Sequence, residues 1–141
     1  MKNSLLGYRL AQIVLVVAGV FYLLTGTALL FAPFWFFQHI GNFPPYNRHY
    51  EGDLGSFLLP LGVGLLITTR SPRRYRALIW VAATGSLLHA GNHIYDALVG
   101  SSSISAWLFE IGPLLVLALV LLAVSWASYS SRSLNQESQS V

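Results

Sequence analysis

Residues 11–32 form an apolar run without a charged side chain, and this run most restricts how the chain can fold. At about 1.5 Å per helical residue, it is long enough to cross the hydrocarbon core of a bilayer, which is about 30 Å thick. It is also longer than the apolar part of a secretory signal peptide. We therefore expect a membrane-spanning helix here.

Three more apolar stretches follow, and the second reaches membrane length only if its helix begins near Tyr46, after Pro44 and Pro45. The four predicted spans are residues 11–32, 47–69, 77–99 and 106–128. They predict an all-α fold, with residues 1–129 forming an integral membrane four-helix bundle. Residues 130–141 form a polar tail that we expect to be disordered.

The composition agrees with a membrane protein and excludes several kinds of site. Only 9% of the residues are charged and 55% are hydrophobic, whereas soluble domains carry about 25% charged residues. The chain has no cysteine, which excludes disulfides, iron–sulfur clusters and thiol catalysis. The net charge of +3 comes from too few residues to indicate nucleic-acid binding, and we attribute it to membrane topology.

The basic residues predict the orientation of the spans. With both termini in the cytoplasm (N-in/C-in), seven of the eight basic residues lie on the cytoplasmic side and only Arg48 lies outside. Cytoplasmic loops carry such an excess of Lys and Arg. We therefore expect a multipass protein of the plasma membrane with the lipid bilayer as its partner. All four histidines and four of the five acidic residues then lie toward the outer end. The exclusion of basic residues from that side is enough to explain why loop residues such as His39 and Glu51 lie there, without a functional role.

That explanation is weaker for the third predicted span, which carries a stripe of polar residues at spacings of three and four. The stripe consists of Ser86, His89, Asn92, His93 and Asp96. This spacing puts them on one face of a helix. Because ionisable groups facing lipid cost several kcal/mol, we expect the stripe to face the bundle interior, and Leu88, Ala90 and Ile94 to face lipid.

The second predicted span repeats this spacing with His49, Asp53 and Ser56, and it runs in the opposite direction. If the two spans are antiparallel neighbours, their polar stripes can meet. Two histidines at i and i+4 can ligate one ion, and a carboxylate from a facing helix can complete the set. The candidate cofactor or metal site comprises His49, Asp53, His89 and His93, with Asn92, Asp96 and Glu110 in support.

The residues leave the ligand of this candidate site open. A metal ion is one possibility, and haem held by His49 with His89 or His93 is another. A quinone is the third. Its apolar slot would be lined by Tyr46, Tyr50, Trp107 and the Phe-rich segment 34–37. The structural alternative is a hydrogen-bonded network that only fixes helix packing.

Several of these residues form a pattern that resembles small four-span bacterial membrane proteins of the broad DoxX-like type, over roughly residues 12–125. The pattern comprises Leu30 to Pro33, Pro45 to Asn47 with His49, Asp53 and Gly55, the break at Arg70 and Pro72, and His89 with His93. The resemblance implies a four-helix membrane bundle. In some members of that group it also implies quinone-linked oxidation or respiratory partners, but it supplies no catalytic set.

Two classes of function fit these features best. The first is a redox-related membrane component that binds a metal, haem or quinone. The second is a non-enzymatic accessory or assembly subunit, in which polar stripes and small residues such as Gly62 and Gly64 only dock helices against each other, a membrane-protein partner or a second copy. A membrane hydrolase with metal-activated water is a third class, and a transporter fits least well because four short helices leave little room for alternating access.

Reporter fusions test the predicted orientation. A reporter after Arg74 should give a cytoplasmic signal and one after Ser102 a periplasmic signal, because the distribution of basic residues puts these positions on opposite sides. Phosphatase activity and the fluorescence of a cytoplasmic reporter, each normalised to expression, measure the two signals. A periplasmic signal at Arg74 would overturn both the orientation and the outward-facing site.

Overall fold

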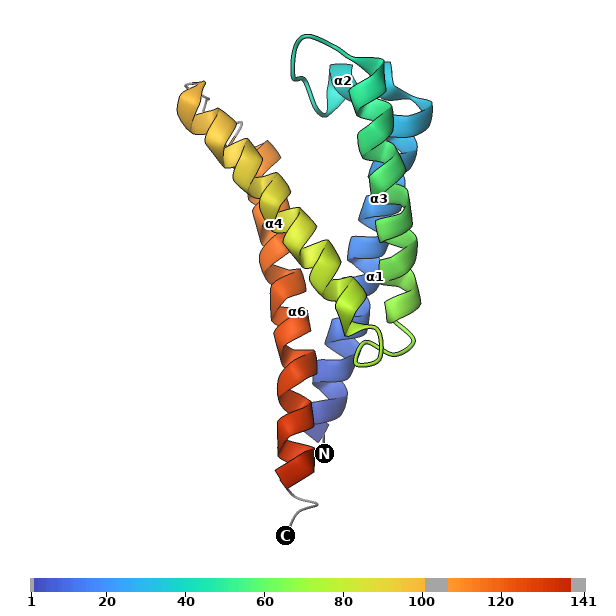
Figure 1. Cartoon of the computed structure of the whole chain (residues 1–141), viewed down its shortest axis with the longest axis vertical. Coiled ribbons are helices and arrows are strands. Elements are labelled where there is room, and N and C mark those ends of the chain that lie inside the picture. The colour runs from blue at the N-terminus through green and yellow to red at the C-terminus, as the bar shows by residue number, and fades with distance from the viewer. Residues whose placement is uncertain (1, 101–106, 138–141) are drawn as a thin grey trace.

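The computed structural model describes residues 2–100 and 107–137, and these residues form helices and connecting loops without a strand. The helices are α1 (Lys2–Phe31), α2 (Pro33–His39), α3 (Arg48–Thr68), α4 (Arg76–Val99), the π-helical η1 (Trp107–Ile111) and α6 (Gly112–Glu137). The four long helices alternate in direction, so α1 begins and α6 finishes at one end of the molecule, while α2 lies at the other (Figure 1). The predicted all-α class is confirmed.

The long helices coincide with the four predicted runs, but α1 begins at Lys2 rather than at residue 11. Its first turns hold the loop that follows α3. The Tyr8 hydroxyl donates to the Arg70 carbonyl at 3.3 Å, and Gln12 Nε2 donates to the Thr69 carbonyl at 2.8 Å. These bonds satisfy carbonyls at the C-terminal end of α3 that have no partner within that helix.

The ends of α3 and α6 also differ from the sequence-based prediction. The α3 helix begins at Arg48, where the Asn47 side chain caps it by accepting from the His49 N–H at 3.0 Å. The α6 helix continues through residues 130–137, which we had expected to be disordered. Extending an existing helix adds one hydrogen bond for each residue fixed, so extension is far easier than nucleation. Residues 138–141 lie outside the described part of the chain.

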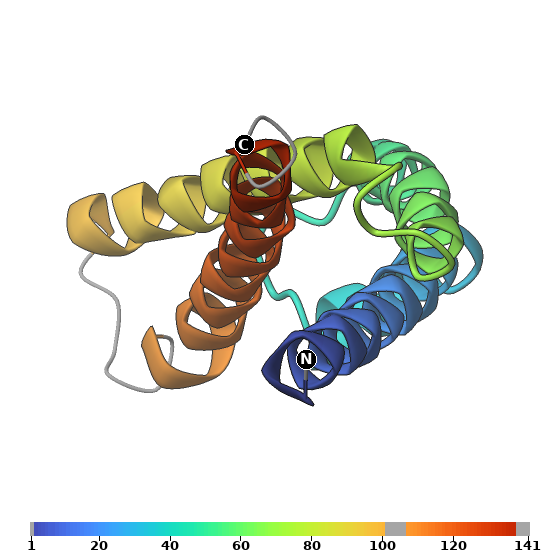
Figure 2. The same cartoon turned by 90° about the horizontal axis from the view of Figure 1, so that it is seen from below.

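The long helices form two antiparallel pairs, α1 with α3 and α4 with α6, which pack far more extensively within the pairs than between them (Figures 1 and 2). Two glycine contacts bring α1 and α3 together at backbone distance. A Cβ at Gly55 would lie 2.8 Å from the Gly26 carbonyl oxygen, and one at Gly62 would lie 2.9 Å from the Gly19 carbonyl oxygen. Side chains other than hydrogen therefore do not fit at this interface.

The α4–α6 pair uses small residues in a similar way. Ala83, Ala90 and Ala97 recur every seven residues along α4 and are buried, as are Ala118 and Ser125 along α6. Such small residues let helices approach closely. The prediction that Ala90 faces lipid was therefore wrong, because its small side chain belongs to this buried row.

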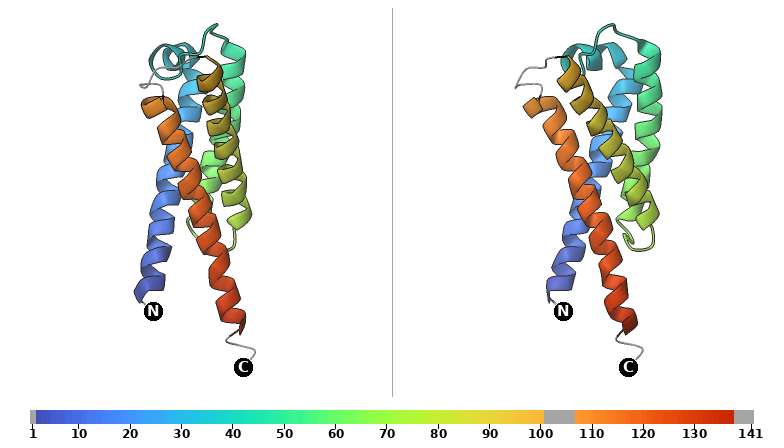
Figure 3. Two further views of the ribbon diagram at one scale, coloured as in Figure 1. Left: turned by 90° about the vertical axis from the view of Figure 1, so that its left-hand side faces the viewer. Right: turned by 60° about the vertical axis from the view of Figure 1, so that its left-hand side comes forward.

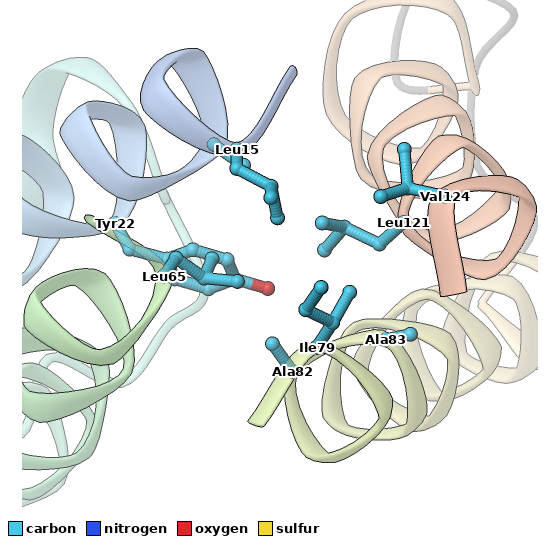
Figure 4. Close-up of a cluster of buried hydrophobic side chains, with 9 residues drawn as sticks. Leu15, Tyr22, Leu65, Ile79, Ala82, Ala83, Leu121 and Val124 are labelled. Carbon is cyan, nitrogen blue, oxygen red and sulfur yellow. The ribbon is translucent and has the colours of Figure 1, made fainter. Parts of the chain in front are cut away.

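Buried apolar side chains from all four long helices join the two pairs. They include Leu15 of α1, Leu65 of α3, Ile79 of α4 and Leu121 of α6 (Figure 4). Beyond this core the α4–α6 pair leans away from the α1–α3 pair toward the end that carries α2 (Figure 1). The four long helices nevertheless all run roughly along the long axis of the molecule, as two further views show (Figure 3).

Two helical segments, Gly7–Phe31 and Arg48–Thr68, are long and apolar enough to cross a membrane by length and composition. Gly112–Trp126 is apolar but shorter. Only 33% and 22% of the residues in the most apolar windows of the two longer segments are buried within the protein. Most residues of these windows are therefore not buried, and apolar side chains on the two helices such as Val17 and Phe57, which are 61% and 72% exposed, face outward as at a surface that contacts a partner or a membrane.

The glycine contacts predict a position-dependent effect of adding one methyl group. Gly55→Ala and Gly62→Ala should each lower the free energy of unfolding by about 1–3 kcal/mol, because the new Cβ overpacks against backbone atoms of α1. Thermal unfolding of the purified protein in mild detergent measures the change.

Gly52→Ala on the same helix is the matched control, because its Cβ would meet nothing within 4 Å. It should be neutral or stabilising, since alanine is favoured over glycine within a helix by about 0.5–1 kcal/mol. If Gly55→Ala proves as stable as Gly52→Ala, the two helices do not meet at backbone distance.

Candidate functional site

A cavity of about 750 Å³ lies between the two helix pairs, near the end that carries α2. Side chains from α1, α2, α3, α4, α6 and the loop before α3 line it. Most are aliphatic or aromatic, and its polar members are Tyr22, Thr25, Glu51, Ser86, His89 and His93. A largely apolar wall with a few polar groups is typical of a site for a small organic molecule.

His89 and His93 project into this cavity from successive turns of α4, and both side chains are partly buried. Their ring centroids are 4.7 Å apart and their planes are nearly perpendicular, at 89°. Phe43, from the loop before α3, packs edge to face on His93 with centroids 5.4 Å apart. The His93 ring is thus held between an imidazole and a phenyl ring. We call His89 and His93 the imidazole pair.

A buried hydrogen bond between the hydroxyls of Tyr22 and Ser86 joins α1 to α4 below the imidazole pair. The Ser86 hydroxyl also donates to the Ala82 carbonyl at 2.6 Å. Because a serine hydroxyl has a single proton, Ser86 accepts the bond from Tyr22. Tyr22 belongs to both the apolar core and the cavity wall, and its hydroxyl points between α3 and α4 (Figure 4). This bond therefore closes the cavity on the side of the core.

Glu51 reaches the cavity from α3 together with Leu54 and Leu58. These three residues are spaced three and four apart, so they share one helix face. From the sequence alone, the exclusion of basic residues from the outer side accounts for Glu51. Its spacing to the two leucines was the signal that it lies on the inward face.

His49 and Asp53 pair with each other at an exposed position instead of lining the cavity. His49 Nε2 lies 3.4 Å from Asp53 Oδ2, and the two side chains are 78% and 57% exposed. Residues two apart in a helix point about 200° away from each other. Because Glu51 faces the cavity, His49 and Asp53 face away from it. The four predicted site residues are therefore divided into two separate pairs.

The supporting residues are divided as well. Asn92 Nδ2 donates to Asp96 Oδ2 at 3.1 Å on an exposed part of α4, so the polar stripe does not face the interior along its whole length. Glu110 lies on η1, and its side chain is outside the part that the structure describes. Among the side chains that the structure describes, no group of three or more His, Asp or Glu is placed to hold a metal ion.

Part of the predicted Phe-rich slot is present. Trp35 and Phe36 of α2 line the cavity beside the imidazole pair. Tyr46 instead packs against Phe34, with ring centroids 5.3 Å apart, and Tyr50 is 71% exposed.

Two further polar residues of the wall, Tyr22 and Thr25, were missed by sequence reasoning. Both lie in the otherwise apolar first run, three residues apart, and that spacing was the available signal.

One protein family, described as a family of unknown function (DUF6632), matches residues 6–140. The matched segment contains every residue of the cavity wall. No curated protein and no solved structure matches the chain.

The hydrogen bond between Tyr22 and Ser86 predicts energetic coupling between α1 and α4. Tyr22→Phe and Ser86→Ala should each lower the melting temperature, and the double variant should lose less than the sum of the two. Interhelical hydrogen bonds in membrane proteins average about 0.6 kcal/mol and reach about 1.7 kcal/mol, so we expect a coupling energy in that range. A double-mutant cycle from unfolding in detergent measures it. Strict additivity would show that the two hydroxyls do not interact.

Proposed function

The chain belongs to the DUF6632 family, whose function is unknown, and we propose that it is a multipass membrane protein that binds a quinone in the cavity. The observation that carries this proposal is the composition of the site, an apolar space of about 750 Å³ with an imidazole pair in its wall. A quinone is a flat apolar ring with carbonyl oxygens at opposite edges. It needs aromatic surfaces for the ring and hydrogen-bond donors for the oxygens.

The membrane part of the proposal is four spans with both termini in the cytoplasm and the cavity in the outer half of the plasma membrane. It is supported by large apolar side chains on the outward faces, such as Ile13, Leu88 and Leu119, which are 59%, 70% and 52% exposed. In a bilayer these side chains would face lipid. Both ends of the described chain lie at the end of the bundle opposite α2 (Figure 1), which agrees with an even number of crossings.

In this proposal the imidazole pair binds the polar edge of the ligand. A neutral imidazole has one N–H donor and one acceptor nitrogen, so either ring can donate to a quinone carbonyl. Trp35, Phe36 and Phe43 supply flat surfaces against which the ligand ring packs. The Glu51 carboxylate can accept a hydrogen bond from a hydroxyl of the reduced ligand. The proposal thus assigns a contact to each chemical part of the quinone.

The same geometry favours a quinone over the other two ligands. Axial histidines on both sides of a haem iron must approach from opposite directions, whereas His89 and His93 are neighbours on one helix and His49 is exposed. A metal ion would need further ligands beside the imidazole pair, and the described residues supply no third one.

The competing proposal is an accessory or assembly subunit without an activity of its own. The hydrogen bond between Tyr22 and Ser86 favours this proposal for Ser86, because the bond docks α4 against α1. Docking does not account for the imidazole pair. An ionisable residue at membrane depth costs roughly 2.5–3.5 kcal/mol on insertion scales. A neutral imidazole lessens that cost, but within the described part of the chain the two imidazole rings stack only with each other and with Phe43.

Quinone titration tests the proposal. The purified full-length protein should bind duroquinone, a quinone without a hydrocarbon tail, and binding should quench tryptophan fluorescence because Trp35 lines the cavity. His89→Ala and His93→Ala should each weaken binding by about tenfold, the equivalent of one lost hydrogen bond of about 1.4 kcal/mol. His49→Ala is the matched control and should bind normally, because His49 lies outside the cavity wall.

Elemental analysis, a visible spectrum and solvent extraction of the same preparations distinguish the alternatives. If the wild type binds no quinone but carries a metal or haem that both variants lose, the ligand was assigned wrongly. If it binds none of the three and both histidine variants melt at lower temperature, the imidazole pair has a packing role and the accessory proposal is favoured.

A further inference from the structure

A second cavity of about 400 Å³ follows the seam between α1 and α6. These helices belong to different pairs and contact each other only slightly (Figure 2). Every side chain that lines this cavity is apolar, among them Val17 of α1 and Val116 and Val120 of α6. We call this second cavity the seam groove.

The seam groove adjoins the quinone-binding cavity proposed above. Phe21, Pro113 and Leu117 line both of them, so these side chains lie between the two spaces. At its other side the groove reaches the outer surface of the bundle, since Val17 and Val116 are 61% and 60% exposed. Apolar side chains thus extend from the cavity to the outward face of α1 and α6.

The chemistry of this path suits a hydrocarbon. Pro113 has no N–H and therefore adds no backbone donor at the junction of the two spaces. An extended peptide segment in the groove would leave backbone groups without partners, because the wall has no polar side chain. A methylene or isoprenoid chain has no such groups.

We infer that the ligand has a long hydrocarbon chain, which leaves the cavity through the seam groove and enters the bilayer sideways. This inference rests on the proposed quinone function and adds to it the kind of quinone and its route. The ring lies at the imidazole pair, the chain passes Phe21 and Leu117, and its far end lies between α1 and α6. The ligand therefore reaches the site from the lipid phase.

Filling the groove tests this route. Val17 and Val116 line the groove and not the cavity, so Val17→Trp and Val116→Trp each place a large side chain in the groove. In lipid nanodiscs, each should weaken binding of decylubiquinone, which has a ten-carbon chain, by about fivefold or more, and should leave duroquinone affinity within about twofold. Val81→Trp is the matched control, because Val81 is 58% exposed on α4 and lines neither cavity. It should leave both affinities unchanged.

The results separate the inference from the function on which it rests. If the wild type binds both quinones and the groove variants bind decylubiquinone normally, the route is wrong and the quinone site stands. The route is also wrong if the variants lose both quinones equally while melting like the wild type. If the wild type binds neither quinone, both proposals fail.

A photolabel keeps the route testable if the tryptophan variants do not fold. A decylubiquinone analogue with a diazirine at the end of its chain is bound to the wild type and irradiated, and the labelled peptides are identified by mass spectrometry. Label on α1 near Val17 and on α6 near Val120, prevented by excess decylubiquinone, supports the inference. Competable label confined to α3 or α4 overturns it.

Discussion

The backbone contact between α1 and α3 is the constraint from which the rest of the arrangement follows. Gly19 faces Gly62 and Gly26 faces Gly55, so two turns of each helix are held at a distance that no other residue permits. This contact makes α1 and α3 one closely packed unit, and the small buried residues of α4 and α6 contribute to a second. A four-helix protein built from two such units packs well within each unit and less closely between them.

The connection between the units explains where the cavity forms. Large side chains such as Leu15, Leu65 and Leu121 fill the space near the chain ends. The hydrogen bond between the hydroxyls of Tyr22 and Ser86 links the two units next to this core. Beyond it the α4–α6 unit leans outward, and aliphatic side chains, aromatic rings and two histidines face the space without filling it. The cavity therefore lies between the same two units, in the part where they no longer pack against each other.

The positions of the helices could be predicted from the sequence, because each requires a long apolar run and such runs are local. The inward faces were harder to predict. On α4 the polar stripe located His89 and His93 correctly in the cavity wall but included Asn92, which is exposed. On α3 the polar spacing predicts that His49 and Asp53 lie on the inward face, but Glu51 and two leucines lie there instead. Near the end of a helix, polarity indicates exposure as readily as an interior site. Only the packing partner, here α1 through Gly55, determines which face is inside, and a single sequence does not contain that pairing.

The same packing also accounts for the position of the seam groove. The small residues that allow close helix contact lie on the faces within each unit, so the faces of α1 and α6 that meet across the seam carry larger branched and aromatic side chains, such as Val17, Phe21 and Leu117. These side chains keep the two helices from approaching as α1 and α3 do. Close packing inside the units and an apolar opening between them are thus two consequences of one distribution of small residues along the chain. A replacement that loosened the α1–α3 contact would change the shape of the opening as well as the stability of the fold, because α1 forms one wall of both.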